Sequence, residues 1–168
     1  MSDATPLKNL LFADYEHELA TTRRVLERIP DEHLGWKPHE KSMALGGLGT
    51  HLANLVRWQI SMLRQDDYDF AANTPRTPAA ESRDALLATY DANVAELRAA
   101  LDQTEDAAFS RVWTLRRGEQ VVFALPRSYV LRSFGLSHMA HHRGQLTVYL
   151  RLLDVPLPSV YGPTADER

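Results

Sequence analysis

Hydrophobic residues recur along this chain at the three- and four-residue spacing of amphipathic helices. The pattern predicts four long helices, over residues 5–29, 43–65, 79–103 and 127–153. Prolines lie between or after these segments, where helices commonly end. Three glycines, at 46, 47 and 49, indicate that the second helix either begins late or packs closely against a neighbour.

The segment between the third and fourth predicted helices has a different pattern. Residues 112–115 and 121–123 are rich in β-formers and flank a turn at 116–119 that contains Gly118. This arrangement predicts a short β-hairpin. Residues 66–78 are polar and contain two prolines, so we expect a loop there. The whole pattern predicts an all-α fold, a four-helix bundle with one hairpin insert, as a single domain over residues 1–168.

Composition and charge restrict the function. Of the 168 residues, 44% are hydrophobic and 24% charged, and the net charge of −3 comes without any basic cluster of the kind that binds nucleic acids. The sequence shows neither an apolar run of membrane-spanning length nor a signal peptide, so we expect a cytoplasmic protein. Because the chain has no cysteine, any thiol chemistry must use a thiol that a co-substrate brings in.

Histidines in two predicted helices suggest a metal site. His51 shares a helical face with apolar residues, where an imidazole without partners is costly. In the last helix, His138, His141 and His142 crowd one arc, and a pair four residues apart can bind one ion. Helical spacing does not decide whether His141 or His142 is the partner of His138. The contrasting interpretation is that these histidines are hydrogen-bonded core residues and bind nothing.

Several motifs resemble those of a known family. The segment 137–146, SHMAHHRGQL, resembles the H-x-x-x-H-R-G-Q signature of the DinB-like (DNA-damage-inducible) superfamily. Segments 34–39 (LGWKPH), 42–46 (SMALG) and 50–55 (THLANL) are similar to that family's approach to its first metal ligand, and 161–167 (YGPTADE) to a common tail. The resemblance implies a four-helix bundle, commonly a homodimer, that binds Zn²⁺ or Ni²⁺ through His51, His138 and His142.

The same resemblance implies a function class. The superfamily includes bacillithiol and mycothiol transferases and a maleylpyruvate isomerase. We therefore predict a metal-dependent enzyme acting on a small molecule, of the thiol S-transferase type, in which the metal activates a low-molecular-weight thiol. The alternatives are a metal-dependent hydrolase and a non-catalytic metal-binding protein of a stress response. No carboxylate stands out as a general base, so the catalytic residues are unassigned.

Four further residues are candidates for a role near the metal. Arg143 and Gln145 lie on the ligand helix, where they can hold a substrate carboxylate or orient a ligand. Trp58 and Tyr149 lie one to two turns from the ligands and can line a pocket. The contrasting interpretations are a surface or interface arginine and ordinary core aromatics.

Overall fold

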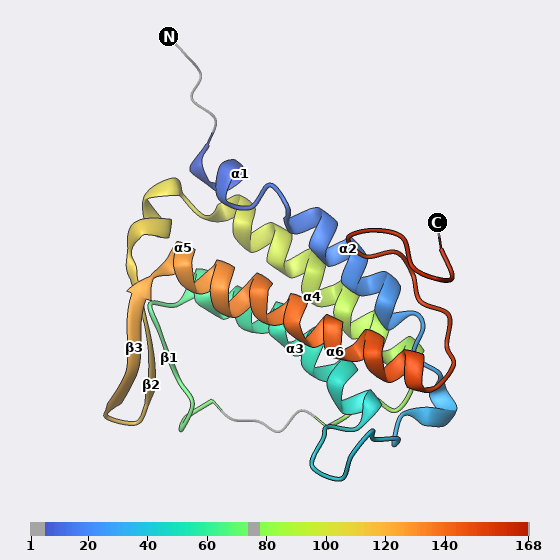
Figure 1. The fold of residues 1–168 in the computed structure, drawn as a ribbon. Helices are drawn as coiled ribbons and strands as arrows, with labels where there is room; N and C mark the ends of the chain where they lie inside the picture. Colours follow the sequence, from blue (N-terminus) through green and yellow to red (C-terminus); the bar gives the residue numbers. More distant parts are fainter. Residues whose placement is uncertain (1–5, 74–77, 168) are drawn as a thin grey trace.

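The fold is mostly helical, with a small three-stranded sheet at one end of the helices (Figure 1). The computed structural model describes residues 6–73 and 78–167. The long helices lie side by side, α3 contacting α4 and α6, and α2 contacting the same two helices from the other side. Their bounds are α2 (Tyr15–Leu26), α3 (Leu45–Arg64), α4 (Arg83–Gln103) and α6 (His138–Leu152). No helix in the described parts of the chain is long and apolar enough to cross a membrane.

The first predicted helix is in fact two helices. A short α1 (Leu7–Leu11) ends at Phe12, and α2 begins at Tyr15. Arg132, far along the chain, donates to the carbonyl of Leu11 at 2.5 Å and to both carboxylate oxygens of Asp14 at 2.8 and 2.9 Å. The Arg132 guanidinium thus provides a hydrogen-bond donor for the Leu11 carbonyl where the helix is interrupted. Helical spacing in the sequence does not reveal this interruption. Two short 3₁₀ turns, η1 (Asp31–His33) and η2 (Asp106–Ser110), follow α2 and α4.

The sheet corrects the prediction of an all-α fold. Strands β2 (Val112–Arg117) and β3 (Gln120–Pro126) pair antiparallel around Gly118, whose φ of 58° suits glycine. The predicted loop 66–78 contains a further strand, β1 (Asp67–Asp69), which pairs parallel with β2. A strand of three residues has too little alternation to stand out in a sequence.

The last predicted helix is continuous but changes its winding. It consists of α5 (Arg127–Val130), a π-helical segment η3 (Leu131–Ser137) and α6. The π segment places Gly135 against Gln59 of α3, a fully buried side chain that accepts a hydrogen bond from the Tyr15 hydroxyl at 2.5 Å. π segments inside α-helices are frequent at functional sites, and this one leads directly into His138.

The contact at Gly135 leads to a stability prediction. A Cβ built on Gly135 lies 2.7 Å from Oε1 of Gln59, whereas a Cβ on Gly144, in the same continuous helix, meets nothing within 4 Å. We expect Gly135→Ala to destabilise the protein by about 1–3 kcal/mol through overpacking. The control Gly144→Ala should be neutral or stabilise it by up to about 1 kcal/mol. Urea unfolding measures both, and equal effects would contradict the close contact.

Two of the three glycines at the start of α3, Gly46 and Gly49, pack closely, whereas a Cβ on Gly47 would meet nothing within 4 Å. The helix begins at Leu45, slightly later than predicted, and a Cβ on Gly49 would lie 2.7 Å from the side chain of Leu86 in α4. α4 itself begins later than predicted, at Arg83, because Ser82 caps it by accepting a hydrogen bond from the Ala85 amide at 3.1 Å.

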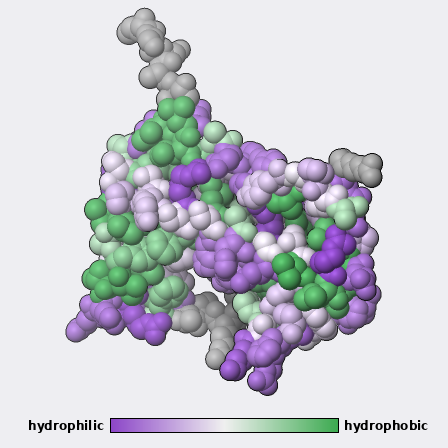
Figure 2. Space-filling model, in the orientation of Figure 1, coloured by the Kyte–Doolittle hydropathy of each residue, from purple (hydrophilic) through white to green (hydrophobic). Residues whose placement is uncertain are grey.

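The core-facing side of α6 consists of four buried residues, Met139, Arg143, Leu146 and Leu150. His138 and His142 lie beside this face and are partly buried, and Leu152 at the end of the helix is exposed. At the end of the molecule where the sheet lies, hydrophobic residues gather at the surface around α1, α5 and the sheet (Figure 2). The exposed hydrophobic residues of these elements include Leu10, Val122 and Tyr129.

Candidate metal centre and adjoining groove

Three histidines from two helices converge at one place. His51 comes from the middle of α3, and His138 and His142 from the first turns of α6. One nitrogen from each of the three rings lies within 4.8 Å of the others. The rings of His51 and His142 are 4.4 Å apart and edge-on, and Nε2 of His138 lies 2.9 Å from Nε2 of His142. The structure therefore brings together the three residues that the sequence resemblance implies as metal ligands.

The hydrogen bonds of the cluster fit a bound cation. Nδ1 of His142 lies 2.7 Å from the amide oxygen of Gln145, so it carries a proton and leaves Nε2 as a lone pair. If His138 then donates from Nε2, its buried Nδ1, which lies beside the Phe134 carbonyl, has no hydrogen-bond donor. If His138 instead carries its proton on Nδ1, two Nε2 lone pairs face each other. A cation held by the lone pairs removes this conflict, and the other ring nitrogens remain free to donate protons outward.

The cluster also favours the uncharged imidazoles that metal binding requires. Burial, and to a smaller extent the neighbouring His142 and His138, lower the pKa of His51 to about 4. Burial likewise lowers the pKa of His138 and of His142, although the Phe134 carbonyl and the Gln145 amide act in the opposite direction. All three rings are therefore neutral near pH 7, with lone pairs available to a metal.

These pKa values predict an acid-sensitive fold in the metal-free protein. An unfolded histidine takes up a proton near pH 6.5, whereas folded His51 does so only near pH 4. Between these values the unfolded chain binds more protons, so the stabilisation that exists above pH 6.5 is lost as the pH falls. We expect unfolding in urea to show a loss of about 1–3 kcal/mol over this range from His51 alone.

Two variants test this pH dependence. The metal-free variant His51→Gln, which has no proton to take up at this position, should lose less stability over the same range. His141→Gln serves as the matched control. His141 is exposed and its ring lies next to that of His142, but it is not one of the three converging histidines. Identical pH slopes for wild type and His51→Gln would contradict the lowered pKa.

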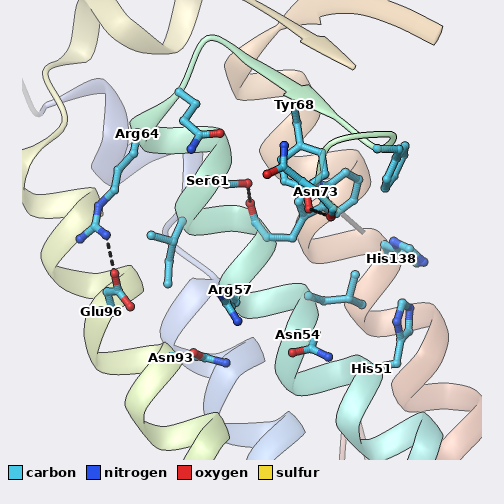
Figure 3. A pocket seen from close by; sticks show the side chains of 15 residues that line it. His51, Asn54, Arg57, Ser61, Arg64, Tyr68, Asn73, Asn93, Glu96 and His138 are labelled. Atoms are coloured by element: carbon cyan, nitrogen blue, oxygen red, sulfur yellow. Dashed lines mark hydrogen bonds and ion pairs between the residues drawn. The ribbon is translucent and has the colours of Figure 1, made fainter. Parts of the chain in front are cut away.

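A groove of about 840 Å³ begins at the histidines and runs along α3. Figure 3 shows His51 and His138 at one end, the ion pair between Arg64 and Glu96 at the other, and Asn54 between them. The aromatic wall comes from Trp58 together with Tyr68 and Phe70, with ring centres 5.6 to 6.3 Å apart. The volume is in the range of sites that hold small molecules.

The four further candidates differ in where they lie. Gln145 contacts His142 directly, and Trp58 lines the groove. Tyr149 is not among the lining residues and packs edge-on against Trp36, with ring centres 5.7 Å apart. Its assignment to the pocket receives no support from these contacts.

Arg143 faces away from the groove and towards α2. Its guanidinium is 1% exposed, bonds to the Glu18 carboxylate at 2.7 Å, and also donates to the Thr22 hydroxyl and the Tyr161 hydroxyl at 3.0 and 2.5 Å. These partners, one of them in the chain's C-terminal segment, occupy the side chain without any substrate. Neither the proposed carboxylate-binding role nor the surface arginine matches this position, and a structural role explains it better.

Some groove residues were absent from the sequence-based candidates. Asn54 follows His51 by three positions on the same helix, so helical spacing could have placed it near the site. Arg57 follows by six positions, which turns it about 120° away from His51 around the axis, so spacing alone would not have placed it there. Tyr68 lies on β1 and Phe70 directly after it. No pattern in the sequence signalled that strand.

Comparisons with known proteins agree with this architecture. The profile of the DinB family matches residues 1–168. The chain belongs to the DinB family. Its curated relative YrdA of Bacillus subtilis (strain 168) is 27% identical over 155 residues, which cover 91% of this chain and 87% of YrdA.

Two solved structures share the DinB fold. A DinB-like protein from Bacillus cereus ATCC 10987 superposes with a TM-score of 0.70 at 22% identity, covering 90% of this chain and 95% of its own. The DinB-like protein YjoA from Bacillus subtilis gives a TM-score of 0.68 at 19% identity, covering 95% and 99%. At these identities the likeness establishes the fold alone. The homodimer expected from the family resemblance stays a prediction.

Proposed function

We propose that this protein is a metal-dependent enzyme that acts on a small molecule held in the groove. The observation that carries the proposal is the convergence of three neutral imidazoles, within 4.8 Å of one another, at the end of a cavity of about 840 Å³. A buried histidine cluster with a purely structural role would not need so large an open space beside it. His51, His138 and His142 would hold Zn²⁺ or Ni²⁺, the ions that the sequence resemblance implies.

The chemistry that the site supports is the activation of a nucleophile. A divalent metal bound by three imidazoles keeps a coordination position open and lowers the pKa of a thiol or water that occupies it. The protein's own residues orient and enclose the reactants. Gln145 fixes the proton of His142 on Nδ1, and the aromatic wall of Trp58, Tyr68 and Phe70 limits the access of water.

A thiol suits this groove better than water. The carboxylate among its described lining residues is Glu96, which is paired with Arg64 and so is not free to act as a general base. A free thiol loses its proton near pH 8.5 and needs much less assistance than water does. The proposed reaction is the transfer of a low-molecular-weight thiol: its proton is released, its sulfur bonds to an electrophilic carbon, and the leaving group departs with its electron pair.

Metal analysis and an activity screen test the two levels of this proposal. Untagged protein should contain about one equivalent of Zn²⁺ or Ni²⁺, and metal-loaded protein should accelerate conjugation of small thiols to a bimane electrophile. The accelerated rate should vanish in His142→Ala. Protein that neither contains nor binds metal would refute the proposal entirely. Metal without conjugation of any thiol would refute the transfer reaction and favour hydrolysis or a non-catalytic role.

A further inference from the structure

The groove has an unbalanced positive charge. Apart from the two histidines assigned to the metal centre, three of its described lining residues carry a formal charge, namely Arg57, Arg64 and Glu96. Arg64 and Glu96 form an ion pair and neutralise each other. Arg57 remains as a cation without a counterion, away from the metal centre, so this part of the groove favours an anionic group of a ligand.

The polar groups closest to this charge also lack partners. Within the described parts of the chain, neither the guanidinium of Arg57 nor the amide of Asn54 has a hydrogen bond or ion pair. Other polar residues of the groove are already engaged: Asn93 donates to the Ala53 carbonyl at 2.9 Å, and the Ser61 hydroxyl donates to the Trp58 carbonyl at 2.6 Å. Among the described lining residues, the free donors therefore include Arg57 and Asn54, together with the Trp58 indole N–H and the Gln65 side-chain amide, and Arg57 is the charged one.

The spacing of these residues suits a small molecule. Arg57 follows His51 by six positions on α3, a rise of about 9 Å along the helix, and Asn54 lies halfway. Figure 3 shows both side chains between the histidines and the ion pair of Arg64 with Glu96. A ligand several bonds long can therefore reach Arg57 with one end while its other end lies at the histidines.

We propose that the groove recognises the carboxylate of its small-molecule substrate through Arg57, assisted by Asn54. A guanidinium binds a carboxylate with two parallel hydrogen bonds, and one unpaired arginine matches a single negative charge better than a phosphate dianion. This inference rests on the proposed function, since the reactive end of the ligand is placed at the metal centre. It adds a substrate class, the carboxylate-bearing thiols.

Matched pairs of ligands test the carboxylate site. Protein loaded with Co²⁺ is titrated by calorimetry with mercaptopropionate and mercaptohexanoate, and with the amide of each. At least one acid should bind roughly tenfold or more tightly than its amide, because hydrogen bonds to charged groups are worth about 1.5–3 kcal/mol. The preference should fall to near unity in Arg57→Gln. It should persist in Arg117→Gln, a control at an exposed arginine of β2 outside the groove.

The outcomes separate this inference from the proposed function. The visible spectrum of bound Co²⁺ first establishes whether the metal centre exists, and its absence would refute the proposed function. With the metal bound, equal affinity for acid and amide overturns the carboxylate site alone, as does failure of all these ligands to bind. A preference that survives in Arg57→Gln also overturns it, because the metal itself would then be the group that attracts the carboxylate.

Discussion

Alanine in place of His51 is expected to weaken metal binding by roughly 100-fold or more. Structural zinc sites with four ligands bind with about 10–16 kcal/mol, so each ligand contributes about 3 kcal/mol, or a factor of about 100 in affinity. His51 is the one member of the histidine cluster that α3 supplies, and its loss leaves two histidines from one turn of α6. Competition with a chromophoric chelator measures the affinity, and metal analysis after dialysis gives the retained fraction.

The neighbouring His141 provides the control for this experiment. It is exposed and belongs to the same helix as two of the proposed ligands, but it is not part of the converging cluster. We expect His141→Ala to keep the wild-type metal content. Equal losses in the two variants would place the metal outside the cluster, and undiminished affinity in His51→Ala would remove His51 from the ligand set.

Arg143→Ala is expected to destabilise the protein by about 3–5 kcal/mol. The substitution leaves the carboxylate of Glu18, whose side chain is only 10% exposed, without its guanidinium partner inside the protein. Removing one member of a buried ion pair costs far more than the pair contributes, because the remaining charge stays desolvated. The Thr22 hydroxyl loses a partner as well. Urea unfolding of metal-free protein measures the change without any contribution from the metal.

An exposed ion pair between neighbouring helices serves for comparison. Arg98 of α4 bonds to Glu16 of α2 at 2.5 Å, but both side chains are more than half exposed. Arg98→Ala should change the stability by no more than about 1 kcal/mol. If Arg143→Ala were as mild, the burial of the Arg143–Glu18 pair would not govern its energy, and a role at the groove would have to be reconsidered.

The long helices could be predicted because each has a buried face several turns long. What the sequence did not reveal depends on contacts between distant residues. The break before α2 is bridged by Arg132, and β1 exists because Tyr68 and its neighbours pair with β2. The π segment is linked to the fit of Gly135 against Gln59 of another helix. Local spacing contains no information about such partners.

The residues of the histidine cluster could be predicted for a different reason. Two histidines four residues apart on a helix must lie close together, whatever the rest of the fold does. Spacing alone did not choose between His141 and His142, and the family resemblance was needed for that choice. Arg143 was misplaced because nearness in sequence was taken for nearness in space. One helical step from His142 turns a side chain by about 100°, which is enough to point it into α2.

The two sides of the groove differ in their stability against local unfolding, because one of them is the three-residue strand β1. The floor of the groove is the long helix α3, which could open only if much of the core unfolded. The rim of the groove at Tyr68 is held by ladder bonds, such as those from the Thr114 and Phe70 amides at 3.0 Å, and by side-chain bonds of Arg116 to Asp67 and Asp69. A strand of three residues whose ion pair at Asp67 is exposed opens at a smaller free energy than a long helix in the core. A bulky substrate can therefore enter by local opening of the rim while the histidines on the helices keep their positions.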